Sequence, residues 1–448
     1  MKKTLFGTDG MRGIANIHPM TPEVVVRLGK AIVEALKNGT RPKILIGKDT
    51  RLSGYMLESA LTTGICSMGG DVLLVGPMPT PAIAHLTRSF AADAGVVISA
   101  SHNPWEHNGI KIFSSKGIKL PDDIELRLEQ LMIKDARNEH VQGIAIGKAK
   151  RIDDAKGRYI EFAKAAIDNF PLQGLKVVLD CANGAAYDIT PHILQELGAE
   201  VIIMFNEPNG TNINKECGSL HPEVMQQAVL KHKADLGIAL DGDADRVIMA
   251  DEKGNLVDGD HLMAIIALDL KEKKQLKKDT VVGTVMTNKG LELYLKKQGI
   301  SLVRTNVGDP YIVEEMLKNG YNFGGEQSGH IICFDHNSTP DATITSLYIM
   351  KIMKEKGKKL SELGTLFKSM PQVLLNSTVR EKRELDKMPN VVNTIKSVEN
   401  ELGEAGRVLV RYSGTENKVR VMIEGENMQK IEAYAQDIMT TIRKELGD

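Results

Sequence analysis

A run of alternating carboxylates, Asp241, Asp243 and Asp245, is followed at once by Arg246. Three carboxylates at every second position can converge on one hard cation, and ligands that are all oxygen favour Mg²⁺ or Ca²⁺ over zinc. An arginine beside such a cluster suits a phosphoryl group in transfer, because it stabilises the charge. A solvated acidic turn is the alternative, but clustered like charges repel each other unless something binds them.

A calcium-binding EF-hand loop is a second interpretation of the same residues. DxDxD opens such a loop, and Glu252 stands at its twelfth position. The sixth position, however, is Arg246, where that loop needs glycine for its turn. The flanking segments also have the pattern of strands rather than helices, so the EF-hand is disfavoured.

Ser101 lies in a polar turn, SASHNP at residues 99–104, directly after an apolar run. A serine at the end of a strand in an α/β sheet can act as a nucleophile or carry a phosphoryl group. His102 beside it does not make a catalytic pair, because neighbours in sequence do not have that geometry. On these residues alone, a polar turn without chemistry is the simpler interpretation.

The glycine-rich turn GGEQSGH at residues 324–330 offers three functional side chains. Glu326 and Ser328 can contact sugar hydroxyls, and His330 can transfer a proton near neutral pH. An ordinary β-turn with a satisfied histidine is the simpler alternative.

The segment RYSGTENK at residues 411–418, with Arg420 after it, has the composition of an oxyanion-binding loop. Guanidinium, hydroxyl and backbone N–H groups suit phosphate, although a polar hairpin explains the segment equally well. A further turn, FGTDGMRG at residues 6–13, adds Arg12. Taken together, a serine carrier, a cation site, sugar contacts and a phosphate anchor are the parts that phosphoryl transfer to a hydroxyl needs.

These side chains would be positioned by alternating strands and helices. Short β-branched runs predict strands at 42–47, 71–76, 94–99, 175–180, 199–205, 234–240, 280–285 and 300–305. Apolar periodicity predicts helices at 22–37, 222–232, 288–298 and 427–446. We therefore expect α/β units with mixed, largely parallel sheets whose strands are buried on both faces.

The order of elements changes near residue 370, where a strand, a helix, two strands and a helix follow. With ~150 residues per domain as a soft guide, we expect three similar α/β domains and a smaller C-terminal α+β domain. The expected boundaries are 1–152 with the serine loop, 153–254 with the metal loop, 255–370 with the sugar loop and 371–448 with the phosphate loop.

Composition excludes several classes of protein. With 57 Lys and Arg against 58 Asp and Glu, no overall field attracts nucleic acid or an anionic membrane. The longest uncharged stretch, 72–87, contains three prolines, so we expect no membrane span and, from the charged start, no signal peptide. Four scattered cysteines argue against a disulfide framework or thiolate zinc site, and a cytoplasmic location is expected.

The four motifs, in this order and across essentially the whole chain, resemble the α-D-phosphohexomutase family. The resemblance implies a heart-shaped molecule of four domains, each donating one loop to a central cleft. Ser101 would be the phosphoserine, and its phosphate would share Mg²⁺ with Asp241, Asp243 and Asp245. The other implied roles are general acid or base for Lys111 and His330, proximity to the transferring group for Arg12 and Arg246, sugar contacts for Glu326 and Ser328, and phosphate binding for Arg411, Ser413, Gly414, Thr415 and Arg420.

Within the family, FGTDGMRG, NGTNINKECGSLHPE (209–223) and GEQSGH resemble the bacterial branch that acts on glucosamine phosphates. The resemblance implies interconversion of glucosamine 6-phosphate and glucosamine 1-phosphate for UDP-N-acetylglucosamine synthesis. One Mg²⁺, phosphorylated Ser101 and glucosamine 1,6-bisphosphate as activator and intermediate would be required. The partners would be small sugar phosphates, not nucleic acid or membrane, and the chain would be a monomer or homodimer.

Three alternatives stay open at this point. A mannose or glucose phosphomutase would use the same mechanism. A cation-dependent sugar-phosphate-binding protein would keep the aspartates but need neither Ser101 nor Lys111, and a phosphatase with an aspartyl nucleophile explains neither the serine loop nor the phosphate loop.

Some positions depart from the family pattern. Pro310 stands where an arginine is common, Asn417 where the phosphate loop usually has proline, and Thr339-Pro340-Asp341-Ala342 replaces a glycine-rich turn. Trp105-Glu106-His107 is also unusual beside the serine loop. None belongs to the implied catalytic set, so they bear on substrate preference and rate more than on reaction class.

Overall fold

The structure is a computed structural model that describes residues 3–7, 9–37, 39–134, 141–412 and 417–447. It divides into two compact units. Unit 1 comprises Met1–Thr284 and Val303–Leu366, and unit 2 comprises Val285–Leu302 and Phe367–Asp448. The expected division into four domains at residues 152, 254 and 370 remains a prediction.

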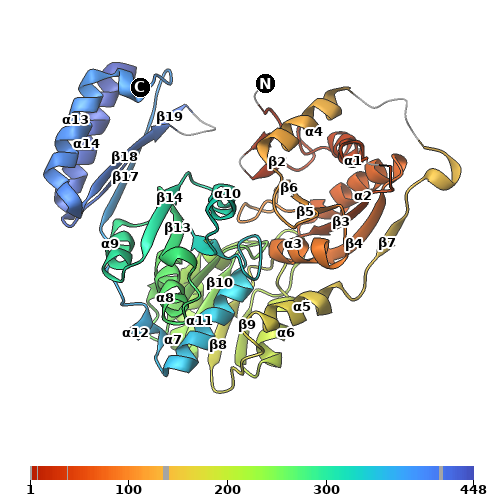
Figure 1. The fold of residues 1–448 in the computed structure, drawn as a ribbon, viewed down its shortest axis with the longest axis horizontal. Coiled ribbons are helices and arrows are strands. Elements are labelled where there is room, and N and C mark those ends of the chain that lie inside the picture. Colours follow the sequence, from red (N-terminus) through yellow and green to blue (C-terminus); the bar gives the residue numbers. More distant parts are fainter. Residues whose placement is uncertain (1–2, 8, 38, 135–140, 413–416, 448) are drawn as a thin grey trace. The chain divides into compact units, whose positions relative to one another are not determined.

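The first sheet of unit 1 has the strand order β1-β2-β6-β5-β3-β4-β7 (Figure 1). Strands β3, β4, β5 and β7 pair in parallel, whereas β1, β2, β6 and β5 pair antiparallel. The strands are β1 (Phe6–Gly7), β2 (Gly10–Ile14), β3 (Lys43–Lys48), β4 (Asp71–Pro77), β5 (Ala94–Ile98), β6 (His107–Ser114) and β7 (Ala149–Arg151).

Four helices accompany this sheet: α1 (Pro22–Leu36), α2 (Ser53–Ser67), α3 (Thr80–Ser89) and α4 (Asp122–Lys134). Helix α1 buries an apolar stripe that includes Val25, Leu28 and Ile32, spaced by three and four residues as helical periodicity requires. These side chains pack with Ile44 and Ile46 of β3 in one continuous core. Burial of the central strands explains why their sequences are almost entirely apolar.

The second sheet has the order β12-β11-β10-β8-β9, with β8, β9 and β10 parallel and β11 and β12 antiparallel. Its strands are β8 (Lys176–Asp180), β9 (Glu200–Met204), β10 (Leu236–Leu240), β11 (Val247–Asp251) and β12 (Leu256–Val257). Helices α5 (Ala155–Ala165), α6 (Ile189–Glu196) and α7 (Pro222–His232) belong to this part of the chain. The β10–β11 hairpin matters most, because its loop carries the three aspartates.

The third sheet has the order β14-β13-β15-β16. Its strands are β13 (Thr280–Thr284), β14 (Ser301–Thr305), β15 (Phe323–Gly325) and β16 (Ile331–Cys333). The nearby helices are α8 (Gly259–Glu272), α10 (Asp309–Asn319), α11 (Ala342–Lys356) and α12 (Leu360–Leu363). The turn between β15 and β16 carries the Glu326 to His330 motif.

Unit 2 is built around a three-stranded antiparallel sheet in the order β17-β19-β18. The strands are β17 (Gln372–Thr378), β18 (Arg407–Tyr412) and β19 (Lys418–Glu424), and the helices are α9 (Lys289–Lys297), α13 (Pro389–Leu402) and α14 (Met428–Leu446). Helices α13 and α14 lie together against this sheet (Figure 1). Val391 and Ile438 of the helices and Val421 of β19 are fully buried in the core between them.

The eight strands and four helices predicted from hydrophobic pattern are confirmed to within two residues at each end. Pattern did not reveal β7, which lies just before the expected domain boundary at residue 152. All three residues of β7 are exposed, so no apolar alternation marks it. β7 extends the first sheet by pairing in parallel with β4.

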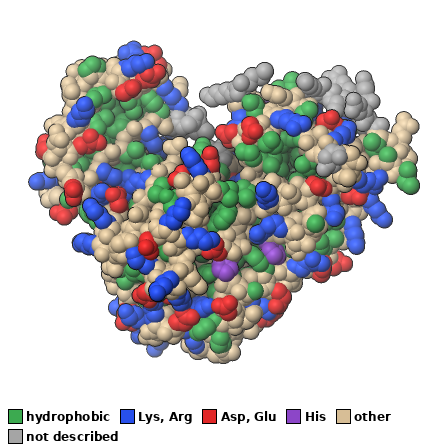
Figure 2. Space-filling view, viewed as in Figure 1, with side chains coloured by type: hydrophobic (Ala, Val, Ile, Leu, Met, Phe, Trp, Pro, Cys, Tyr) green, Lys and Arg blue, Asp and Glu red, His purple; other side chains and the backbone are tan. Residues whose placement is uncertain are grey.

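Among the described residues, no helix is both long and apolar enough to cross a membrane. Basic and acidic side chains are interspersed over the face shown in Figure 2, as the near-zero net charge predicts. All four cysteines are free thiols in the structure, and three of them are buried.

Candidate active site

Ser101 lies in the loop after β5, and its hydroxyl donates a 2.7 Å hydrogen bond to Asp241 Oδ2. The serine is 1% exposed and has a φ of 53°, a left-handed conformation that non-glycine residues seldom adopt. Gly242 allows the two loops to touch, because a Cβ there would lie 2.6 Å from the Ser101 carbonyl oxygen. The serine loop and the aspartate loop therefore form one site.

The carboxylates of Asp241, Asp243 and Asp245 offer oxygens that all lie within 4.8 Å of one another. All three side chains are buried, and within the described part of the chain Asp243 Oδ1 has no hydrogen-bond partner. An orphaned buried carboxylate oxygen is costly unless something binds it. A site made only of carboxylate oxygens, one of them unused, fits a hard divalent cation such as Mg²⁺.

The electrostatics of the aspartates agree with this interpretation. Burial, together with the charges of Asp245 and Asp243, raises the pKa of Asp241 to about 8. A carboxyl group so close to two others resists ionisation until a cation offsets the repulsion. The repulsion among the three carboxyl groups therefore also favours a bound divalent cation such as Mg²⁺.

Lys111 reaches the same cluster from β6, where it lies opposite Val97 of β5. Its Nζ lies 2.9 Å from Asp243 Oδ2, 3.0 Å from Asp245 Oδ2 and 3.2 Å from Asp9 Oδ2. Burial lowers the pKa of Lys111, but these three carboxylates outweigh burial and raise it well above the ordinary value. Lys111 is therefore a protonated ammonium group. It places positive charge next to the aspartate loop, which also accepts the hydrogen bond from Ser101.

His330 is positioned by the β15–β16 turn and by an isolated bridge to Arg246. Its Nδ1 lies 2.7 Å from Glu326 Oε2, and its Nε2 lies 2.8 Å from Arg246 Nε and 3.0 Å from Asp245 Oδ1. A neutral imidazole accepts a hydrogen bond from Arg246, whereas a protonated one donates to Asp245. Both protonation states consequently have a partner.

Burial lowers the pKa of His330, as does the charge of Arg246, yet the carboxylates of Asp245 and Glu326 raise it overall to about 10. Glu326 in turn accepts a 3.0 Å hydrogen bond from the Gly308 backbone N–H through Oε1. Glu326 thus orients the histidine. Ser328, the other predicted sugar contact in this turn, is exposed. The arrangement suits His330 to acid–base work.

Asp9, which sequence reasoning passed over, connects several of these groups. Its carboxylate pairs with Arg12, Lys111 and Lys119. Burial raises the pKa of Asp9, but Lys111, Lys119 and Arg12 outweigh burial and hold it well below the ordinary value. The sequence could have indicated Asp9 through its place in the FGTDGMRG turn, three residues before Arg12.

In unit 2, Arg411 of β18 and Arg420 of β19 lie directly opposite each other. Like charges in such a cross-strand pair repel, and burial together with Arg420 lowers the pKa of Arg411. Arg420 Nε is buried without a partner among the described residues. The pair fits an oxyanion, and the other predicted phosphate-binding residues, Ser413, Gly414 and Thr415, lie outside the described residues.

Two of the departures from the family pattern have structural roles. Pro310 occupies the first turn of α10, where its missing N–H costs nothing. Asp341 caps α11 by accepting a 3.0 Å hydrogen bond from Ile344 N and also accepts 2.9 Å hydrogen bonds from the buried Tyr159 hydroxyl. Trp105 is 36% exposed, and the Asn417 carbonyl accepts a 2.9 Å bond from Val379 N.

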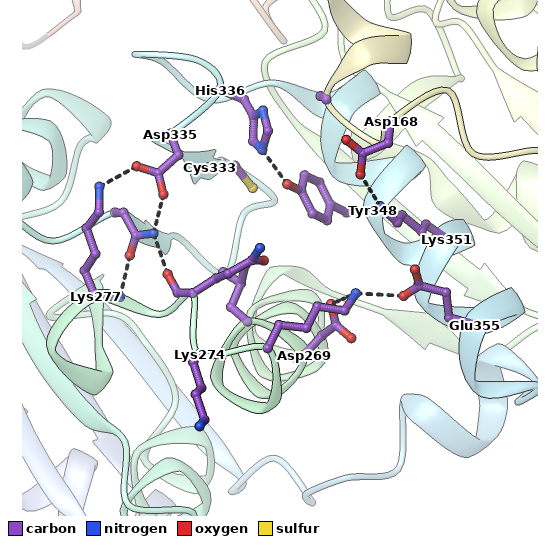
Figure 3. A pocket seen from close by; sticks show the side chains of 15 residues that line it. Asp168, Asp269, Lys274, Lys277, Cys333, Asp335, His336, Tyr348, Lys351 and Glu355 are labelled. Carbon is purple, nitrogen blue, oxygen red and sulfur yellow. Dashed lines mark hydrogen bonds and ion pairs between the residues drawn. The ribbon is translucent and has the colours of Figure 1, made fainter.

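A cavity of about 690 Å³ in unit 1 is a rival location for a ligand (Figure 3). Three of its lysines are already paired with carboxylates: Lys273 with Asp269 at 2.8 Å, Lys277 with Asp335 at 2.6 Å and Lys351 with Asp168 at 2.9 Å. Figure 3 shows two of these pairs, Lys277 with Asp335 and Lys351 with Asp168. Because these three lysines are already neutralised by carboxylates, the pocket is a weaker candidate than the aspartate cluster.

Comparison with known proteins places this geometry in context. Four family models match: phosphoglucomutase/phosphomannomutase α/β/α domain I over residues 3–139, domain II over 157–254, domain III over 258–370 and the C-terminal domain over 374–441. A curated relative from Pelobacter propionicus, called phosphoglucosamine mutase, is 55% identical, and the match covers 100% of this chain and 99% of the relative.

Solved structures share the fold. A phosphoglucomutase/phosphomannomutase family protein from Burkholderia thailandensis aligns with a TM-score of 0.82 at 21% identity, covering 98% of this chain and 97% of the other. An Aspergillus fumigatus N-acetylphosphoglucosamine mutase, solved with GlcNAc-6P and magnesium, aligns with a TM-score of 0.69 at 18% identity and covers 99% and 95% of the two chains. The chain belongs to the phosphoglucomutase/phosphomannomutase family, the α-D-phosphohexomutases.

Proposed function

We propose that this chain is a phosphoglucosamine mutase, which interconverts glucosamine 6-phosphate and glucosamine 1-phosphate through phosphorylated Ser101 and a 1,6-bisphosphate. The single observation that carries the chemistry is the 2.7 Å hydrogen bond from Ser101 Oγ to Asp241 in the buried aspartate cluster. The glucosamine preference is supported by eight relatives with that name at 53–55% identity.

Asp241, Asp243 and Asp245 would hold one Mg²⁺ together with an oxygen of the Ser101 phosphate. When bound, the ion supplies Lewis-acid stabilisation of phosphoryl charge. The unused Asp243 Oδ1 supports this assignment, and so does the magnesium with which the Aspergillus fumigatus mutase was solved.

In the forward direction the bond from phosphorus to Ser101 Oγ breaks, and a bond from phosphorus to O1 of glucosamine 6-phosphate forms. The proton of the O1 hydroxyl must leave, and a proton must reach Ser101 Oγ unless the oxygen stays ionised. Because its pKa of about 10 keeps His330 protonated near neutral pH, His330 can donate the proton that Ser101 Oγ receives, and the neutral imidazole left behind can accept the proton from O1. Lys111 is our other acid–base candidate, and in this arrangement it supplies fixed positive charge.

The bisphosphate must then turn so that its 6-phosphoryl group returns to Ser101. Arg246 and Arg12 would place positive charge beside the transferring group. Glu326 and Ser328 would contact sugar hydroxyls. Arg411, Ser413, Gly414, Thr415 and Arg420 would grip the phosphate that is not being transferred, whichever end of the sugar carries it.

The decisive experiment compares kcat/KM for glucosamine 6-phosphate, mannose 6-phosphate and glucose 6-phosphate, with Mg²⁺ and a trace of hexose 1,6-bisphosphate. We expect a strong preference for the glucosamine substrate. Preference for mannose or glucose phosphate would move the substrate but keep the mechanism, and absence of any turnover would favour a cation-dependent sugar-phosphate-binding protein. In cells we expect this activity in the cytoplasm.

A further inference from the structure

The loop that carries Ser101 is held in a conformation that it would not adopt alone. Ser101 has a φ of 53°, and such a left-handed backbone costs free energy for a residue with a side chain. The serine is nevertheless buried, with its hydroxyl on Asp241. The contacts that hold the loop must therefore come from outside it.

Arg51, which follows β3, makes most of these contacts. Its guanidinium is fully buried and uses all five N–H donors. Nη2 donates to the carbonyls of Ser101 at 2.9 Å and Asn103 at 2.8 Å. Nη1 donates to the carbonyls of His107 at 3.1 Å and Pro104, and Nε donates to Asp49 at 2.8 Å. One rigid side chain thus binds three carbonyls of the serine loop and the carbonyl of His107, the first residue of β6.

Asp49 carries the same support to the other side of Ser101. Asp49 Oδ2 accepts a 2.6 Å hydrogen bond from Ser99 Oγ, and Ser99 Oγ accepts a 2.9 Å bond from the Ser101 backbone N–H. Both peptide groups that flank the Ser101 Cα are therefore fixed. Fixing both removes the backbone rotations that would carry the side chain away from the aspartate loop, and the hydrogen bond to Asp241 then holds the hydroxyl against rotation about the Cα–Cβ bond.

Asn214 grips the loop from the other direction. It lies in NGTNINKECGSLHPE, the segment at 209–223 whose residues have no part in the proposed chemistry. Its Nδ2 donates to the Ser101 carbonyl at 2.8 Å and the Asn103 carbonyl at 3.1 Å. The Ser101 carbonyl thus accepts from Arg51 and Asn214 at once.

We propose that Arg51 and Asn214 are positioning residues, which hold the serine loop in one backbone conformation so that Ser101 Oγ stays aimed at Asp241 with and without phosphate. The proposal rests on the proposed mutase function. Misplacement of reacting groups by about 1 Å can cost roughly 100-fold in rate, so the loss of this grip should appear in kcat.

The test uses the full chain and three variants. Asn214→Gly removes the two hydrogen bonds but tolerates the φ of 57° at that position. Asn169→Gly is the matched control, because Asn169 also has a left-handed φ, 53°, and is exposed. Arg51→Lys keeps the charge beside Asp49 but loses the planar fork of donors.

For Asn214→Gly we expect kcat to fall roughly 10-fold, and for Arg51→Lys roughly 10- to 100-fold, while KM for glucosamine 6-phosphate changes less than about twofold. Backbone amides of residues 101–107 should exchange with deuterium faster in both variants, and Asn169→Gly should match the wild type. Should Arg51→Lys fail to fold, Asn214→Gly decides the matter alone.

An Asn214→Gly variant with wild-type kcat and wild-type amide exchange would overturn the proposal, as would a defect confined to KM. If the wild type turned over no sugar phosphate, the proposed function would fail. The exchange of residues 101–107 in Asn214→Gly against Asn169→Gly would still decide whether these side chains hold the loop.

Discussion

Ser101 and Asp241, which are 140 residues apart in the chain, are joined by a 2.7 Å hydrogen bond from the serine hydroxyl to the aspartate. A phosphate on Ser101 would bring close to two negative charges to this carboxylate. If Ser101 carries the phosphate, as we propose, the site needs positive charge to offset this repulsion.

Ser101→Ala should abolish turnover while leaving the fold intact, because it removes one oxygen and no packing. The measurement is kcat/KM together with the thermal midpoint, and Ser59→Ala on the exposed face of α2 is the control. Detectable multiple turnover by a pure, folded Ser101→Ala protein would contradict the role of Ser101 as phosphoryl carrier.

Asp243→Asn should weaken Mg²⁺ binding at least 100-fold, since it converts the unpartnered carboxylate oxygen into an amide. This loss exceeds the 10- to 100-fold typical when only an outer partner of a ligand is removed. Titration calorimetry of the unphosphorylated protein with MgCl₂ measures the affinity directly. Asp153→Asn, a change at an exposed aspartate, is the control. Unchanged Mg²⁺ affinity in Asp243→Asn would place the cation elsewhere.

Arg420→Met should raise KM for sugar phosphates roughly 10- to 100-fold, as expected from losing a charged hydrogen bond worth about 1.5–3 kcal/mol. The ligand-free protein should be no less stable, because the substitution relieves repulsion between Arg420 and Arg411. Steady-state kinetics and urea unfolding measure the two effects, with Lys430→Gln as control. A purely structural arginine would show the reverse pattern, with lower stability and an unchanged KM.

Strand and helix positions could be predicted from this sequence because buried parallel strands are almost uniformly apolar, as in β3 and β10. Polar or very short strands such as β7 could not be predicted, because they form by pairing with a neighbouring strand and bury no apolar pattern of their own. β6 was hidden for a different reason. Its buried residues include Asn108 and Lys111, polar side chains that interrupt the apolar pattern.

The same contrast holds for the site. Ser101 and the three aspartates were candidates because strand ends collect functional loops, and the family resemblance selected His330 from its glycine-rich turn and gave each of these residues its role. The structure brings them together. Arg51, in the segment KDTR, also follows the end of a strand, β3. It was not predicted as a site residue because no motif distinguishes a single arginine. Asp9 and Asn214 depend on contacts made by distant segments, which no local pattern encodes.

His85 should make the protein sensitive to acid. It stacks on Phe162 with ring centroids 3.7 Å apart, and burial, followed by the charges of Arg88 and Arg158, lowers its pKa to about 4. Between pH 6.5 and 4 the unfolded chain therefore binds a proton that the folded protein does not, so stability falls as pH falls through this window.

The contribution of His85 is at most about 1.4 kcal/mol per pH unit. His85→Gln should flatten the dependence of unfolding free energy on pH between 6.5 and 4, measured by urea titrations at several pH values. His192→Gln, at an exposed histidine, should leave the wild-type slope. Equal slopes for all three proteins would show that His85 is not the group that titrates.

Gly242→Ala and Gly157→Ala should move stability in opposite directions, although the substitution is the same. At Gly242 the new Cβ would lie 2.6 Å from the Ser101 carbonyl oxygen, closer than real contacts allow. The serine and aspartate loops must then separate, and we expect a loss of about 1–3 kcal/mol together with reduced kcat.

At Gly157, inside α5, a Cβ meets nothing within 4 Å, and alanine favours the helix by about 0.5–1 kcal/mol. Urea unfolding of both variants measures the contrast, and kinetics should be unchanged for Gly157→Ala. The pair separates a general effect of adding a methyl group from the specific closeness of two loops. Wild-type kcat and stability in Gly242→Ala would mean that the loops can move apart without cost, which the shared hydrogen bond from Ser101 to Asp241 argues against.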